Sequence, residues 1–150
     1  MPSSRSNIDR LEHVGSIRQT MASAAEARVR EVESLVRTIE LEEQRIARKI
    51  YDTRAEITYR AGMTGQDIQQ NEKYVEVLKK QRLMVLQRLE KAKAALQERH
   101  NEWIEARREH KIVERLQERR LLEWQRQEDI ALQKSADEAF IGRLVRARKT

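Results

Sequence analysis

Apolar residues recur along the chain at alternating spacings of three and four. In residues 22–57, nine of the eleven repeat positions are apolar, and most positions between them are charged or polar. The eleven positions are Ala22, Ala25, Val29, Val32, Val36, Ile39, Glu43, Ile46, Ile50, Thr53 and Ile57. This spacing gathers the apolar side chains on one stripe of an α-helix, whereas a strand would alternate every second residue. The stretch therefore predicts one helix of a coiled coil.

The same repeat returns further along the chain, where ten of fourteen positions are apolar. These positions are Ile68, Asn71, Val75, Leu78, Arg82, Val85, Leu89, Ala92, Leu96, Arg99, Trp103, Ala106, His110 and Val113. No proline or glycine interrupts residues 66–141. Because these two residues are the strongest helix breakers, the second stretch predicts one long continuous helix.

The segment RAGMTGQD (60–67) separates the two repeats. Gly62 suits the left-handed conformation that ends a helix, because it has no Cβ to clash. Thr64 and Asp67 have the spacing of a capping box, in which each side chain satisfies a free amide at a helix start. The two signals together predict a tight turn between antiparallel helices. The alternative is one continuous helix in a parallel dimer, in which Gly62 and Gly65 would cost about 1 kcal/mol each.

An antiparallel hairpin with this turn has a defined register. It predicts four apolar pairs across the seam, Ile50 with Leu78, Ile39 with Leu89, Val32 with Leu96 and Ala25 with Trp103. Glu43 would lie near Arg82, so that one polar seam residue faces another and helps to fix the register.

The ends of the first helix are less regular. The capping-box spacing of Ser6-Asn7-Ile8-Asp9 predicts a helix start near residue 7. Gly15 and the different phase of Val14, Ile17 and Met21 predict a weaker first stretch. The predicted fold is all-α, an antiparallel two-helix coiled-coil hairpin with an overhanging C-terminal helix. We expect a single domain over 1–150, with helices at about 7–61 and 65–146 and a turn at 62–64.

Residues beyond about 118 have no partner in this register, yet the segment 121–150 is rich in apolar side chains. They are Leu121, Leu122, Trp124, Ile130, Phe140, Ile141, Leu144 and Val145. The pairs Phe140–Leu144 and Ile141–Val145 form an apolar ridge, and the end, RLVRARKT (143–150), is basic. A projecting helix of this kind predicts a binding element, and the alternative is a frayed terminus.

Composition supports a helical rod over a compact core. Charged residues make up 37% of the chain, aromatic residues 4%, and Pro2 is the single proline. High charge also fits disorder, but the regular repeats argue against it. The net charge is +6 with the two signs interleaved, which does not favour nucleic-acid binding. The chain has no cysteine, no apolar run long enough for a membrane span and no signal-peptide pattern, so we expect a cytoplasmic protein.

The sequence offers little catalytic chemistry. Its glycines, at positions 15, 62, 65 and 142, do not match a phosphate-binding loop. His13, His100 and His110 are scattered, without the spacing of metal ligands. We expect no enzyme activity, no metal or other cofactor and no small-molecule substrate.

Two motifs resemble the flagellar export protein FliJ family. In GMTGQDIQQNEKYVEVLKK (62–80), the family's hairpin tip is matched by a glycine, an apolar residue, a threonine, an aromatic-apolar pair and a leucine. These are Gly62, Met63, Thr64, Tyr74, Val75 and Leu78. The segment ERRLLEWQRQEDIALQKSADEAFIGR (118–143) is similar to the family's ending through Gln133, Lys134, Asp137, Glu138 and Phe140. Ala139 is inserted before Phe140, where the family has none.

The resemblance implies a stalk component of the flagellar type III export apparatus, peripherally associated with the inner membrane at the flagellar base. It implies insertion into a hexameric export ATPase, promotion of that ATPase's assembly and activity, a link to the membrane export gate, and the recycling of export chaperones. The implied gate contacts are Tyr74, Leu78, Gln81 and Val85. The implied ATPase contacts are Trp124, Ile130, Phe140, Ile141, Leu144, Arg143 and Arg146.

Three alternatives stay open. The first is the equivalent stalk of a virulence-type injectisome, which binding to the cognate ATPase would separate from the flagellar protein. The second is a coiled-coil scaffold without an ATPase partner. The third is a nucleic-acid-binding helical protein, which salt-dependent DNA binding would support.

Overall fold

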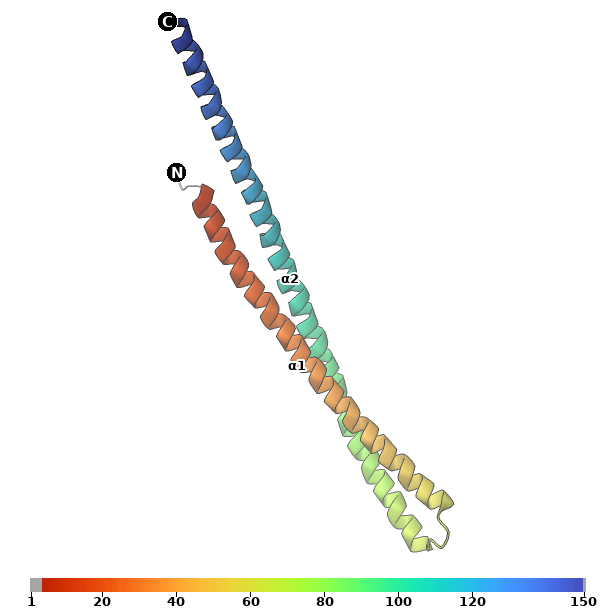
Figure 1. Ribbon diagram of the computed structural model, residues 1–150. Helices are drawn as coiled ribbons and strands as arrows, with labels where there is room; N and C mark the ends of the chain where they lie inside the picture. Colours follow the sequence, from red (N-terminus) through yellow and green to blue (C-terminus); the bar gives the residue numbers. More distant parts are fainter. Residues whose placement is uncertain (1–3, 150) are drawn as a thin grey trace. The chain divides into compact units, whose positions relative to one another are not determined.

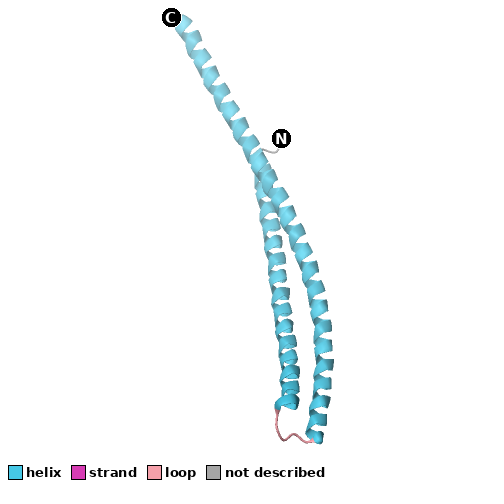
Figure 2. Ribbon diagram, turned by 90° about the vertical axis from the view of Figure 1, so that its right-hand side faces the viewer, coloured by secondary structure: helices cyan, strands magenta, loops and turns pink. Residues whose placement is uncertain are grey.

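The computed structural model describes residues 4–149 and contains two α-helices joined by a short turn (Figure 1, Figure 2). Helix α1 is Ser4–Tyr59 and helix α2 is Gly65–Lys149. The predicted all-α fold is confirmed. The described residues leave out residues 1–3 of the predicted domain, which include Pro2, and residue 150.

The chain divides into two units. The turn unit is residues 24–104, and the terminal unit combines residues 1–23 with residues 105–150. Each unit pairs a segment of α1 with a segment of α2, and the two are described separately below. The single elongated domain expected from the sequence stays a prediction.

The helix ends differ from the expected ones by a few residues. Helix α1 begins at Ser4, so Ser6 lies inside it and not at its N-cap. The capping-box prediction at Ser6 is therefore wrong, because the residues before it are already helical. Helix α1 ends at Tyr59, earlier than expected, and α2 extends to Lys149, later than expected. Terminal turns are the part of a helix that sequence patterns locate least well.

The turn unit contains the hydrophobic core. Its buried cluster draws residues from both helices and consists of Val36, Ile39, Ile46, Ile50, Val75, Leu78, Val85 and Ala92. Three partly buried residues pack against this cluster, Val32, Leu89 and Leu96. The core includes members of three of the four predicted apolar pairs. Glu43 accepts a hydrogen bond from Nε of Arg82 at 2.9 Å, which confirms the predicted polar pair in the seam. Arg28 and Glu102 form a second ion pair between the helices, and the two pairs show that the segments run antiparallel.

The turn between the helices has the predicted stop and start signals. Gly62 adopts a φ of 84°, a left-handed conformation that side chains with a Cβ disfavour. The Thr64 hydroxyl accepts a hydrogen bond from the Asp67 amide at 3.2 Å, and the Asp67 carboxylate accepts one from the Thr64 amide at 3.2 Å. This reciprocal pair is a capping box, and it satisfies two amides that would otherwise be free at the start of α2.

The terminal unit keeps the same heptad phase on α1. Ile8, Leu11, Gly15 and Arg18 face α2, while Val14, Ile17 and Met21 are exposed. The three apolar residues of different phase therefore lie outside the seam, and the weaker first stretch stays a prediction. The pattern of apolar residues does not reveal this seam, because two of its positions are Gly15 and Arg18. The facing segment of α2 provides polar partners at both positions.

Those polar partners are specific. Arg18 forms an ion pair with Glu109. The side-chain amide of Gln117 donates a hydrogen bond to the Leu11 carbonyl at 2.8 Å. A Cβ on Gly15 would overlap the Gln117 amide, so the glycine leaves the space that this side chain occupies. Polar contacts thus help to hold the terminal unit together, whereas the turn unit has a buried aliphatic core.

Helix α2 continues past the start of α1 in the terminal unit, where its C-terminal end is drawn blue (Figure 1). Residues 128–149 are exposed apart from Gly142. The start of α1 reaches slightly further along α2 than expected, since Asn7 and Ile8 share a crevice with Trp124 and Gln127. The predicted overhang is confirmed, but it begins after Gln127 and not near residue 118.

Replacing Thr64 with alanine removes one half of the capping box. We expect a loss of about 1 kcal/mol in the free energy of unfolding, because an amide at the start of α2 loses its acceptor. Thr58→Ala is the matched control, since Thr58 is an exposed threonine inside α1 whose hydroxyl bonds only its own helix at Arg54. Chemical denaturation measures both variants, and equal stability of the two would contradict a capping role for Thr64.

Gly15 and Gln117 are expected to be energetically coupled. Gly15→Ala alone gains about 1 kcal/mol of helix propensity and loses a hydrogen bond of similar value, so its net effect is near zero. In a Gln117→Ala background, Gly15→Ala is expected to stabilise α1 by the full value of about 1 kcal/mol, because no hydrogen bond of Gln117 is lost. Hydrogen exchange of the amides in residues 4–23 measures the local stability of the four proteins. Additive effects of the two changes would show that the Gln117 amide does not depend on the space beside Gly15.

Candidate functional site

The residues predicted to contact the export gate fall into two groups. Leu78 and Val85 are only 3% and 5% exposed and belong to the core between α1 and α2. A partner could not reach them without separating the helices. Tyr74 is 47% exposed, and Gln81 is also exposed. Only the second pair offers a surface to another protein.

Two further residues share the exposed face with Tyr74 and Gln81. Val77 and Met84 are 51% and 65% exposed. The four residues follow one another at spacings of three and four, which places them on one stripe of α2. The gate contacts implied by the family resemblance do not include Val77 and Met84, and two of those implied contacts, Leu78 and Val85, are seam positions. An apolar residue recurring outside the seam was the signal that could have identified Val77 and Met84.

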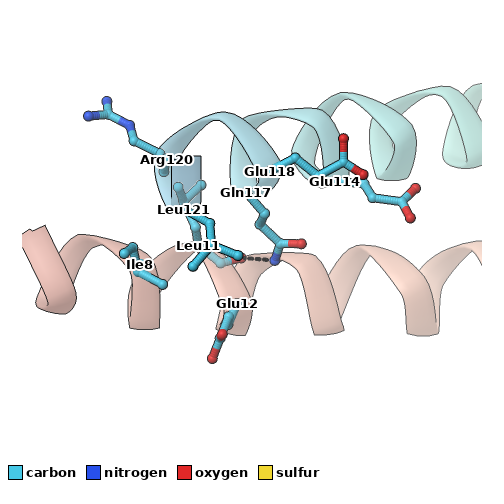
Figure 3. Close-up of a pocket in the computed structure, with 8 residues that line it drawn as sticks. All are labelled: Ile8, Leu11, Glu12, Glu114, Gln117, Glu118, Arg120 and Leu121. Carbon is cyan, nitrogen blue, oxygen red and sulfur yellow. Dashed lines mark hydrogen bonds between the residues drawn. The ribbon is translucent and has the colours of Figure 1, made fainter. Parts of the chain in front are cut away.

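A shallow crevice lies between the two helices of the terminal unit (Figure 3). Its volume is about 220 Å³, and its apolar lining comes from Ile8, Leu11 and Leu121. Gln117 reaches across it to the Leu11 carbonyl, while Glu12 points away on the other side of α1. The crevice is an incompletely packed part of the helix pair, and its open position gives no water-excluded site for catalysis.

Trp124 lies beside this crevice and not in the overhang. Its side chain is half-buried, and Asn7 and Ile8 of α1 line the small hollow next to it. Trp124 therefore packs where α1 begins. A protein that binds Trp124 would have to approach next to the start of α1. A protein that binds the residues after Gln127 would not meet α1.

The other predicted ATPase contacts all lie on the exposed overhang. Ile130, Phe140, Ile141 and Leu144 are between 51% and 61% exposed, and Arg143 and Arg146 are exposed as well. The last turn of α2 contains Arg146, Arg148 and Lys149. Positive charge at a helix C-terminus interacts favourably with the exposed carbonyl groups there. The overhang thus presents large apolar side chains together with a basic tip.

Within residues 4–149, no group of three or more histidine, aspartate or glutamate side chains is arranged to hold a metal ion. The described helices also include none whose length and apolar character would suit a membrane span. The exposed apolar surfaces described above are the stripe of Tyr74, Val77, Gln81 and Met84 in the turn unit, which we call the Tyr74 stripe, and the overhang in the terminal unit.

Comparison with protein families gives a match over nearly the whole chain. The family model described as "Flagellar FliJ protein" matches residues 6–150. Comparisons with curated proteins and with solved structures gave no match. The family match covers both helices and the turn, including every residue of the two candidate surfaces. The chain therefore belongs to the FliJ family of flagellar proteins.

Proposed function

We propose that this protein is a non-enzymatic stalk of the flagellar type III export apparatus, which binds the hexameric export ATPase and promotes its assembly and activity. Family membership over residues 6–150 supports a role in flagellar export. The observation that carries the more specific role is the exposed overhang of α2, whose apolar side chains are too large and too numerous for an ordinary solvated helix end.

In this proposal the ATPase contact lies on the overhang. Ile130, Phe140, Ile141 and Leu144 supply apolar area, and Arg143 and Arg146 supply positive charge. Aromatic and arginine side chains contribute most to binding energy at protein interfaces. A continuous helix also holds these residues in a fixed relation to one another, which lowers the entropic cost of binding. Trp124 is a secondary contact, available where α1 begins.

The Tyr74 stripe is the proposed contact for the membrane export gate. Tyr74 and Gln81 come from the predicted set, and Val77 and Met84 replace the buried Leu78 and Val85. Binding of this stripe and of the overhang to different partners would link the ATPase to the gate. Export chaperones are further proposed partners, and the protein would act at the cytoplasmic face of the inner membrane.

The equivalent injectisome stalk is the second candidate function. The family description refers to the flagellum, which favours the flagellar assignment. The same overhang and stripe would serve either system, since both require contact with an ATPase and a gate. Pull-down with the flagellar and the injectisome ATPase of the same cell distinguishes the two.

Deletion of residues 136–150 is expected to abolish stimulation of the cognate ATPase. The deletion removes Phe140 and Leu144 with the basic tip and leaves the core of the turn unit untouched. ATP hydrolysis by the purified hexamer is measured with the full chain and with the truncated chain. Leu132→Ala is the control, because Leu132 is 67% exposed on the same overhang but outside the proposed contact. Undiminished stimulation by the truncated chain would exclude residues 136–150 as the ATPase contact.

Tyr74→Ala is expected to weaken binding to the export gate by at least tenfold, as for an interface residue that contributes more than about 1.4 kcal/mol. ATPase stimulation should stay unchanged. Tyr59→Ala is the matched control, since Tyr59 is another exposed tyrosine, at the end of α1. Binding is measured with the purified cytoplasmic part of the gate. Gate affinity equal to that of the unmodified protein would show that Tyr74 lies outside the contact.

A further inference from the structure

One face of α2 in the terminal unit carries exposed apolar residues at positions that are partly symmetric about the middle of the segment. Ile112, Leu116, Ile130, Ile141 and Val145 are between 40% and 60% exposed. At about 100° per residue, they fall within an arc of about 60° around the helix. This face, which we call the lateral face, lies to one side of the seam that packs against α1.

The lateral face is self-complementary about a point between residues 128 and 129. A two-fold axis there, perpendicular to α2, sets Leu116 opposite Ile141 of a second copy. The same axis sets Ile112 opposite Val145 of the second copy. Each of these apolar side chains is exposed in the single chain. Aliphatic residues therefore meet at both ends of the paired segment.

The charged residues follow the same symmetry. Between the apolar pairs, the axis sets Glu123 opposite Lys134 of the second copy. It likewise sets Arg120 opposite Asp137. Immediately beside that pair, Arg119 meets Glu138. Every one of these charged side chains is exposed. Each charged pair is of opposite sign, so that the symmetry joins acid with base as consistently as it joins apolar with apolar.

We propose that two copies of this chain associate antiparallel through the lateral face of α2. A two-fold interface uses the same surface on both subunits, so that surface must complement itself under reversal of direction. The lateral face meets this requirement at two apolar pairs and three charged pairs, while Ile130 is set opposite Gln127 of the second copy. A contact with an unrelated protein would impose no such symmetry on the sequence.

Helix α1 adds to the proposed interface. Val14 comes one residue before the seam residue Gly15, just as Leu116 comes one residue before Gln117. In an antiparallel pair, positions with equal offset from the seam lie on the same side. The hydrogen bond from Gln117 to Leu11 places Val14 and Leu116 at nearby levels along the pair. The end of α2 from the second copy would therefore pack as a third helix against both.

Charge exchange across the two-fold axis tests this proposal. Glu123→Lys would place two lysines opposite each other, and Lys134→Glu would place two glutamates opposite each other. Because the axis repeats each contact, each single change is expected to weaken association roughly tenfold at low salt. The double variant restores the opposite charges and should return to within about threefold of the unmodified chain. Analytical ultracentrifugation of the full-length protein measures the dissociation constant.

Glu98→Lys is the matched control, because it makes the same change in net charge at an exposed position of the turn unit. It should leave association unchanged. A chain that stays monomeric at every concentration, or a double variant as weak as the singles, would overturn the proposal. So would single changes that weaken ATPase binding and not self-association, since Glu123 and Lys134 would then belong to the ATPase contact alone.

The absence of cysteine from the chain allows a second test of the register. A variant with both Leu116→Cys and Ile141→Cys should form a disulfide-linked dimer under mild oxidation, because the two positions meet across the axis. Leu116→Cys with Leu132→Cys is the control, in which the thiols lie at different levels along the helices. Equal yields of covalent dimer from both variants would contradict the antiparallel register.

Discussion

The turn at residues 60–64 determines which residues of α1 face α2, and the other features of the molecule depend on that register. Gly62 reverses the chain in a left-handed conformation, and the Thr64–Asp67 capping box begins α2 at a defined residue. A shift by one residue would turn the seam of α2 away from α1 by about 100°. The ion pair between Glu43 and Arg82 opposes such a shift, because a charged side chain in the seam needs its partner at one level.

The fold was largely predictable because its information is local and repeated. Aliphatic residues at heptad spacing predicted both helices of the turn unit, and the glycine and capping signals predicted the turn. The segment 4–23 was harder to interpret, since its seam includes Gly15 and Arg18. Gly15 and Arg18 fit in the seam because they lie opposite Gln117 and Glu109, which are far away in the sequence. A pattern of hydrophobicity along one helix contains no information on such pairs.

The candidate surfaces were predictable in their location but not in every residue. The overhang followed from the unequal lengths of the helices, and Phe140 and Leu144 were expected to be exposed. Near the turn, the gate contacts implied by the family resemblance included Leu78 and Val85, which the structure buries in the core. A motif records which residues recur and does not separate those that hold helices together from those that contact a partner. The burial of each side chain distinguishes the two kinds of residue. The proposed gate contact therefore includes the exposed Val77 and Met84 in place of the buried Leu78 and Val85.

The same segment of α2 is assigned two partners: Ile130 and Ile141 belong to both proposed contacts, whereas Phe140 belongs to the ATPase contact alone. Phe140 lies about 100° around the helix from Ile141, which belongs to the lateral face. The most direct test of the proposed function is therefore photo-cross-linking from position 140, with a photoreactive phenylalanine analogue in the full-length protein and the cognate ATPase hexamer present. The ATPase should be the cross-linked product, and the same analogue at position 74 should not capture it. Capture of the ATPase from position 74 and not from position 140 would contradict the proposal.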